Sequence, residues 1–106
     1  MILANTETIP GYKITDVKGI AKGNVVRAKN VGKDLVSSFR NVVGGEMTEY
    51  TELMTDSRQR AMQRMVENAE NQEADAVVNV RFETSQISSG AAELLAYGTA
   101  VAIEET

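Results

Sequence analysis

Residues 46–72 carry apolar or small side chains at spacings of three and four, and no other stretch constrains the fold as strongly. This pattern predicts one long α-helix with a buried face and a solvated face. The buried face comprises Met47, Tyr50, Leu53, Met54, Ser57, Ala61, Met65 and Ala69. At about 1.5 Å per residue the helix would be roughly 40 Å long, longer than a small domain needs. This length predicts that the helix packs on more than its own sheet.

A second, shorter helix is predicted at residues 35–43, because Asp34 can cap its first turn and three apolar residues then share one face. Gly44 and Gly45 end this pattern, since glycine readily adopts the positive φ that stops a helix. The two glycines also precede the first turn of the long helix, whose free N–H groups attract anions. They are a candidate ligand site, although an αα-turn needs such glycines anyway and Glu46 beside them repels anions.

Residues 12–29 have the β-branched content of a strand, interrupted by Gly19 and Gly23. Glycine within a strand indicates a bulge, a bend or a close backbone approach. The stretch is therefore either one long bent strand or two short strands. The residues before it are polar, with Pro10–Gly11 as the only strong turn signal.

A further strand is predicted from residue 76, where apolar and polar residues alternate with a period of two. Val78, Val80 and Phe82 are expected to share its buried face. The serine-rich residues 84–90 are expected to form a loop.

The last strand, at about residues 92–103, is apolar or small on both faces. One face comprises Leu95, Tyr97, Thr99, Val101 and Ile103, and the other comprises Leu94, Ala96, Gly98, Ala100 and Ala102. A strand of this kind is covered on both sides. Because one long and one short helix can cover only one side of a small sheet, the second side is predicted to pack against another copy of the chain.

Composition excludes several classes of protein. The chain has no cysteine and no histidine, so it lacks the thiolate and imidazole ligands that zinc and copper sites prefer. Its net charge of −4 gives no general attraction to nucleic acid. The basic residues concentrate in residues 1–45, which leaves open an anionic partner or a pairing of basic and acidic halves between subunits. The apolar run at 91–103 is too short to span a bilayer, and a soluble cytoplasmic protein is expected.

Four short segments occur in the order and spacing of a known family. They are Ile9-Pro10-Gly11, Gly44-Gly45 before the long helix, Ala74-Asp75-Ala76-Val77-Val78, and Tyr97-Gly98-Thr99-Ala100-Val101. The chain resembles the YbjQ-like family of small uncharacterised bacterial proteins, as a single domain over residues 1–106.

The resemblance implies an α+β, dodecin-like subunit, in which the long helix packs on an antiparallel sheet. It also implies a homopentamer arranged like a β/α propeller, with extra short strands joining neighbours. Whether such pentamers stack further is left open. The family carries a heavy-metal-binding label, but no established activity, cofactor or ligand comes with the resemblance.

Metal and catalytic sites have weak support in the residues themselves. Glu46, Glu49 and Glu52 could hold a hard cation if symmetry gathered them into a ring, but a solvated helix face is the favoured explanation of these residues. No catalytic residue is predicted, because a serine or tyrosine nucleophile would need a base and none is evident. Tyr97 is a candidate ligand contact, and its alternative role is a structural hydrogen bond within the core.

One residue departs from the family pattern. Where the family has Gly-Ala-Asn-Ala-Val, this chain has Glu73-Ala74-Asp75-Ala76-Val77. If residue 73 adopts positive φ at the end of the long helix, Glu73 is strained where glycine would not be. If the helix runs through residue 73, no such strain exists.

Two classes of function follow from these patterns. The first is a homo-oligomeric ring that binds a small ligand or ion between subunits. The second is a scaffold ring without a small ligand. An enzyme is less favoured, because the chain has no cysteine and no histidine, which are common as nucleophile and as acid–base catalyst.

Overall fold

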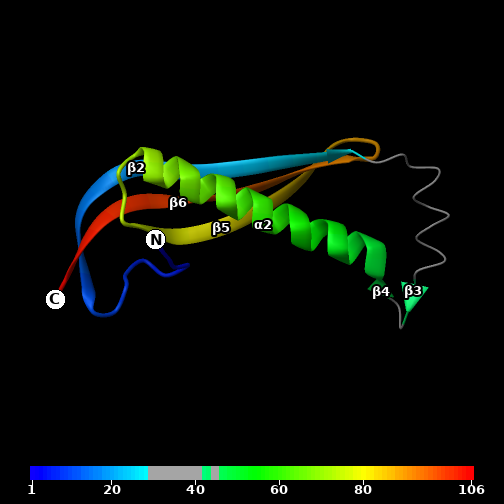
Figure 1. Ribbon diagram of the computed structural model, residues 1–106. Helices are drawn as coiled ribbons and strands as arrows, with labels where there is room; N and C mark the ends of the chain where they lie inside the picture. Colours follow the sequence, from blue (N-terminus) through cyan, green and yellow to red (C-terminus); the bar gives the residue numbers. More distant parts are fainter. Residues whose placement is uncertain (29–41, 44–45) are drawn as a thin grey trace.

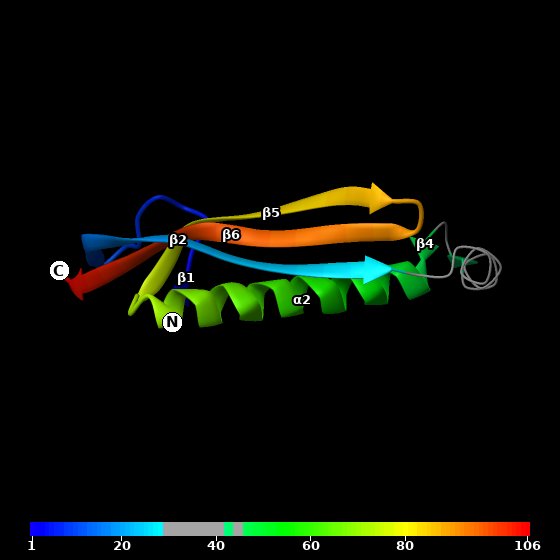
Figure 2. The ribbon, with the colours of Figure 1, turned by 90° about the horizontal axis from the view of Figure 1, so that it is seen from above.

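One long helix lies on a four-stranded sheet in this computed structural model, which describes residues 1–28, 42–43 and 46–106 (Figures 1 and 2). The sheet has the order β1-β5-β6-β2. Its strands are β1 (Ile2–Leu3), β2 (Tyr12–Ala28), β5 (Ala76–Ser88) and β6 (Ala91–Glu105). The helix is α2 (Thr48–Asn71), and β3 (Val42–Val43) pairs with β4 (Glu46–Met47) in a separate ladder. The predicted α+β class is confirmed.

β2 is one continuous strand, paired antiparallel with β6 over nearly its whole length. Register shifts fall between Ile14 and Asp16 and between Val17 and Gly19. These irregularities bend the strand, so the single bent strand is the correct one of the two possibilities. Gly19 has a φ of 151°, which glycine tolerates better than any other residue.

The core lies between α2 and the strands β2 and β6. The helix buries a stripe of mostly small residues, and these are Ser57, Ala61, Met65 and Ala69. Small side chains let the helix approach the sheet closely at Gly23 of β2, where a Cβ atom would lie 2.3 Å from the Ala61 oxygen and the Met65 nitrogen. Of the bulge, bend or close approach that a glycine within a strand indicates, Gly23 is a close approach.

Side chains of α2, and of Gln72 directly after it, also cover part of the outer edge of β2. The Arg64 guanidinium donates to the Asn24 oxygen at 2.7 Å, and the Gln72 amide donates to the Ile20 oxygen at 3.0 Å. Between them, the Lys22 nitrogen donates to Asn68 Oδ1 at 3.1 Å. These bonds satisfy backbone N–H and C=O groups on the outer edge of β2 that no neighbouring strand pairs. The helix consequently lies beside β2, with β5 on the far side of β6 (Figure 2).

The boundaries of the helices differ from the predicted ones. The predicted short helix at 35–43 is wrong at its end, because Val42–Val43 is the strand β3; residues 35–41 lie outside the described residues. The long helix begins at Thr48, since Glu46–Met47 pairs with β3. β-Branched valines favour this extended pairing over a helical turn.

The sheet is mixed rather than purely antiparallel, because β1 pairs parallel with β5. β1 lies in the first residues of the chain, for which the sequence predicts only polar character. The predicted turn at Pro10–Gly11 is confirmed by the hydrogen bond from the Tyr12 nitrogen to the Ile9 oxygen.

The predicted loop at 84–90 is wrong for most of its length, since β5 continues to Ser88. Its serine and threonine side chains are exposed, and a strand tolerates them on a surface.

A bulge in β5 overturns the predicted alternation of its apolar residues. Asn79 has a φ of 55°, and the register shifts between Val78 and Arg81. The extra residue moves Val80 to the helix side of the sheet, whereas Val78 packs on the opposite side. Val78, Val80 and Phe82 therefore do not share one face.

Directly after α2, residue 73 adopts the left-handed backbone conformation that ends many helices. Glu73 has a φ of 60°. The Ala74 nitrogen donates to the Ala69 oxygen at 3.1 Å, and the Glu73 nitrogen donates to the Glu70 oxygen at 2.9 Å. These two bonds form a Schellman motif, in which glycine is the preferred residue at the position of Glu73.

Glu73→Gly is expected to stabilise the protein by about 1 kcal/mol, because it removes the cost of a left-handed side-chain-bearing residue. It also removes a negative charge beside the negative end of the helix. Thermal unfolding at fixed subunit concentration measures the change. Glu67→Gly, at an exposed position inside the helix, is the matched control and should destabilise by about the same amount. A lower melting temperature for Glu73→Gly would contradict the strain.

Candidate functional site

The sheet face opposite α2 is largely uncovered and carries large apolar side chains. On β2, Val17 is 62% exposed, Ile20 is 70% exposed and Val26 is 54% exposed. Their cross-strand neighbours on β6 include Val101 and Thr99, from the face of the last strand that points away from the helix. Residues near the amino terminus, Ile2 and Ile9, cover only one end of this surface, around Ala76, Val78 and Val101. We call Val17, Ile20, Val26 and Thr99 the open face.

A row of polar residues crosses the same side of the sheet, between Ile20 and Val26. Lys22, Tyr97 and Arg81 stand opposite one another on β2, β6 and β5. The Tyr97 hydroxyl donates to Glu83 Oε1 at 3.2 Å. Burial raises the pKa of the Tyr97 phenol above its ordinary value of 10.0, and the Glu83 carboxylate raises it further. Tyr97 therefore stays protonated and acts as a hydrogen-bond donor.

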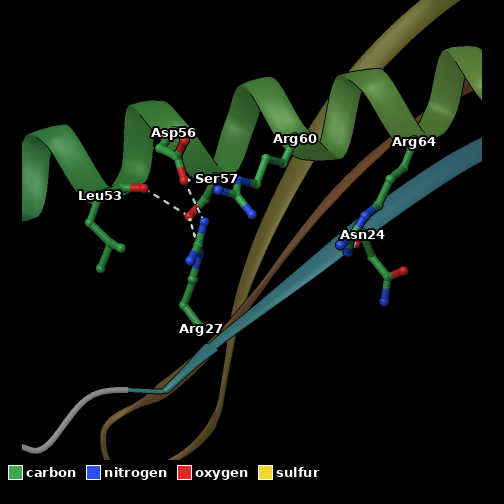
Figure 3. Close-up of polar contacts among 7 residues, drawn as sticks. All are labelled: Asn24, Arg27, Leu53, Asp56, Ser57, Arg60 and Arg64. Carbon is green, nitrogen blue, oxygen red and sulfur yellow. Dashed lines mark hydrogen bonds and ion pairs between the residues drawn. The ribbon is translucent and has the colours of Figure 1, made fainter.

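A second polar cluster joins the end of β2 to the first half of α2 (Figure 3). Arg27 forms an ion pair with Asp56, and its Nε donates to Ser57 Oγ at 3.1 Å. The Ser57 hydroxyl donates to the Leu53 oxygen at 2.8 Å, and Arg60 Nε lies 3.1 Å from Asp56 Oδ2. Ser57 is 1% exposed and its proton is committed to the helix backbone. The cluster therefore fastens the helix to the strand, and its serine is not arranged as a nucleophile.

Two hollows lie on the helix side of β5, which α2 leaves partly uncovered. The first has a volume of about 500 Å³ and is lined by Leu3, Ala4, Asn5, Met62, Val80, Arg81 and Phe82. The second, of about 510 Å³, lies between the first turns of α2 and the tip of the β5–β6 hairpin. Its lining includes Leu53, Met54, Thr84 and Gln86. Both hollows are open surface grooves bordered by apolar side chains.

The predicted site residues are distributed as follows. Gly44 and Gly45 lie outside the described residues, and so do the side chains of Glu46 and Glu49. Glu52 is exposed on α2. Across the part of the chain whose side chains are described, no three Asp or Glu residues gather in a way that could hold a metal ion. The ligand and metal sites at these residues stay predictions.

Sequence patterns did not identify the two features that stand out in the structure. The sequence does not show which face of β2 carries its exposed valine and isoleucine residues, because the bulges in β2 obscure its period of two. The pair Arg27–Asp56 joins residues 29 positions apart, and no local spacing signals it. Within the described ranges, α2 is too polar to cross a bilayer and no other helix is present as a candidate.

Comparison with known proteins gives consistent matches along the chain. A family model described as "Putative heavy-metal-binding", YbjQ, matches residues 1–104. A "UPF0145 protein" of Methanosarcina acetivorans is 56% identical over 97% of both chains. A "UPF0145 protein" of Thermosipho africanus is 52% identical over 100% of this chain and 98% of its own. Since similar proteins occur in archaea, the expected restriction to bacteria is too narrow.

A solved structure has a similar fold. It is the crystal structure of a protein of unknown function of the DUF74 family from Pediococcus pentosaceus, with a TM-score of 0.68 and 14% sequence identity. The match covers 98% of each chain. At this identity the likeness concerns the fold alone.

Proposed function

The chain belongs to the YbjQ (UPF0145) family, and we propose that it is the subunit of a cytoplasmic homopentamer that binds a small ligand or ion where subunits meet. The subunit is dodecin-like in this proposal, with its helix on one side of the sheet and a neighbouring copy on the other. The observation that carries the proposal is the open face. Val17, Ile20 and Val26 are more than half exposed in the isolated chain, and burying such side chains is favourable by about 1.5–3 kcal/mol each.

The shape of the chain also favours self-assembly. Its Cα radius of gyration is 17.2 Å, whereas a compact chain of this length has about 13 Å. A flat, two-layer subunit leaves one side of its sheet in water unless a partner covers it.

The scaffold without a small ligand is the second candidate. It is favoured by the polar groups of Arg27, Ser57 and Tyr97, which are bonded to one another or to neighbours within the subunit. Native mass spectrometry of gently purified protein distinguishes the two candidates. A retained small molecule or ion supports the ligand-binding ring, and bare subunits support the scaffold.

Ile20→Glu is expected to dissociate the assembly, because it places a charge on the open face that association would have to desolvate. Light scattering should give five times the subunit mass of 11.5 kDa for the unaltered protein and a much lower mass for the variant. Ile20 is 70% exposed in the subunit, so the variant subunit should keep its fold and circular dichroism spectrum.

Gln63→Glu provides the control, since it adds the same charge at an exposed position of α2. This variant should keep the mass of the unaltered protein. A well-folded monomer of the unaltered chain at micromolar concentration would overturn the proposed assembly.

A further inference from the structure

The groove of about 500 Å³ beside β5 is lined by apolar side chains from three separate elements. Leu3 belongs to β1, Met62 to α2, and Val80 and Phe82 to β5. We call the hollow between these four side chains the β5 groove. It exists because α2 lies over β2 and β6 and leaves β5 on the far side of β6 (Figure 2). Its volume falls within the range of about 300–1,000 Å³ that small-molecule sites occupy.

The bulge at Asn79 supplies the floor of the β5 groove. The bulge places Val80 on the helix side of the sheet. The pairing of β5 with β6 is regular from Arg81 onward, so Phe82 shares this side with Val80. Phe82 is 40% exposed, and Met62 on the wall is half-buried. The helix side of β5 therefore presents apolar side chains that the subunit itself only partly covers.

Arg81 also lines the β5 groove and brings a cation to it. Its Nη1 donates to the Asn5 oxygen at 2.8 Å and to the Val80 oxygen at 3.0 Å. The neighbours of Asn5, Ala4 and Thr6, accept hydrogen bonds from the backbone of β5. These contacts hold the guanidinium at the edge of β5. The N–H groups on Nε and Nη2 donate to no described residue, and together they form one planar fork.

No ion pair neutralises the charge of Arg81 within the described part of the chain. Arg60 lies 3.1 Å from the Asp56 carboxylate, whereas no described carboxylate lies within ion-pair distance of Arg81. Glu83, two residues further along β5, accepts a hydrogen bond from the Tyr97 hydroxyl instead. A planar fork of this kind matches the two oxygens of a carboxylate. Arg81 is thus oriented by backbone oxygens and still has donors for an anionic group.

We propose that the β5 groove binds a small organic monoanion with an apolar tail, of the class of medium-chain carboxylates. The carboxylate bonds to Nε and Nη2 of Arg81, and the tail lies along the four apolar side chains. Arg81 is the one cation among the described residues that line the groove, so the groove matches one negative charge and not the higher charge of a phosphate. Met62 is flexible enough to adapt to the tail. The site lies within one subunit, on the side of the sheet opposite the open face, and it does not depend on the proposed assembly.

Titration calorimetry with decanoate tests the inference. We expect saturable binding of one decanoate per subunit, with a dissociation constant below about 1 mM. Decanol lacks the charge and acetate lacks the tail, so each should bind at least about tenfold more weakly than decanoate. Binding of decanol as tight as that of decanoate, or no saturation by decanoate, would overturn the proposed ligand class.

Arg81→Gln should weaken decanoate binding by about tenfold or more, because it removes the charged fork. Arg60→Gln is the matched control: it makes the same change at an exposed arginine of α2 that already has a carboxylate partner. This control should bind decanoate as the unaltered protein does. Circular dichroism checks that both variants keep the fold. Equal affinities of Arg81→Gln and the unaltered protein would contradict the role of Arg81.

Methyl and aromatic NMR signals supply a second readout that needs no substitution at Arg81. Decanoate should shift the methyl signal of Met62 and the ring signals of Phe82 in the unaltered protein. The methyl signal of Met65, which is fully buried between α2 and the sheet, should stay in place. Binding that leaves the Met62 and Phe82 signals unchanged would show that decanoate occupies another site.

The dissociated Ile20→Glu variant separates this inference from the proposed ring. Because the β5 groove belongs to one subunit, the variant should bind decanoate as tightly as the unaltered protein. Loss of binding in the variant would overturn the groove and favour a site between subunits. Binding by the variant alone would also overturn it, since the groove would then be covered in the assembled protein. If the unaltered chain is monomeric and binds decanoate through Arg81, only the proposed assembly falls.

Discussion

Gly23→Ala is expected to lower the free energy of unfolding by about 3 kcal/mol, at the upper end of the cost of overpacking. The added Cβ would lie 2.3 Å from both the Ala61 oxygen and the Met65 nitrogen. Both are backbone atoms, so a side-chain rotation cannot relieve the clash and the helix itself must move away from β2. Denaturant unfolding at fixed subunit concentration measures the loss.

The neighbouring residue provides the control for this experiment. Lys22 lies on the opposite face of β2 and is exposed, so Lys22→Ala should change stability by less than about 0.5 kcal/mol. Equal stability of Gly23→Ala and the unaltered protein would mean that α2 does not approach β2 as closely as the structure indicates.

Met65→Ala is expected to destabilise the protein by about 3 kcal/mol, within the range measured for large-to-small changes in cores. Met65 is fully buried, and its side chain fills the space between α2 and the sheet. The small neighbours Ala61 and Ala69 cannot expand to fill the cavity. Chemical unfolding followed by circular dichroism measures the change.

Met62→Ala is the matched control, because Met62 lies three residues earlier on the same helix and is half-buried beside the groove at β5. It should cost less than Met65→Ala under conditions in which the subunits are dissociated. A cost for Met65→Ala below that of Met62→Ala would contradict the position of the core under β2 and β6.

The long helix could be predicted from the sequence because its buried face repeats every three to four residues over six turns. The two apolar faces of β6 could be predicted for a similar reason, since alternate residues of a regular strand lie on opposite faces. Comparison with the family glycine identified residue 73 as a possible left-handed helix end, and its φ of 60° shows that this alternative is the correct one. In each of these cases the signal is local and spans consecutive residues.

Other features could not be predicted because they depend on contacts between distant segments. The bulge at Asn79 moves Val80 to the opposite face, and a single inserted residue leaves no mark in the composition. β1 consists of two residues, which pair with β5 more than 70 positions away. The Arg27–Asp56 ion pair and the caps on the edge of β2 exist only because α2 lies beside that strand.

The sequence by itself determined the long helix and the central parts of β2, β5 and β6, since periodicity and turn residues act over a few neighbours along the chain. It also indicated that β6 needs cover on both faces. Only the tertiary structure decided where α2 lies across the sheet, which residues of β2 stay exposed and which edge of the sheet remains unpaired. The physical reason is that these properties follow from the register between strands and from the close approach of the helix at Gly23. Both depend on how surfaces far apart in the sequence fit together, and a local pattern of residues does not encode that fit.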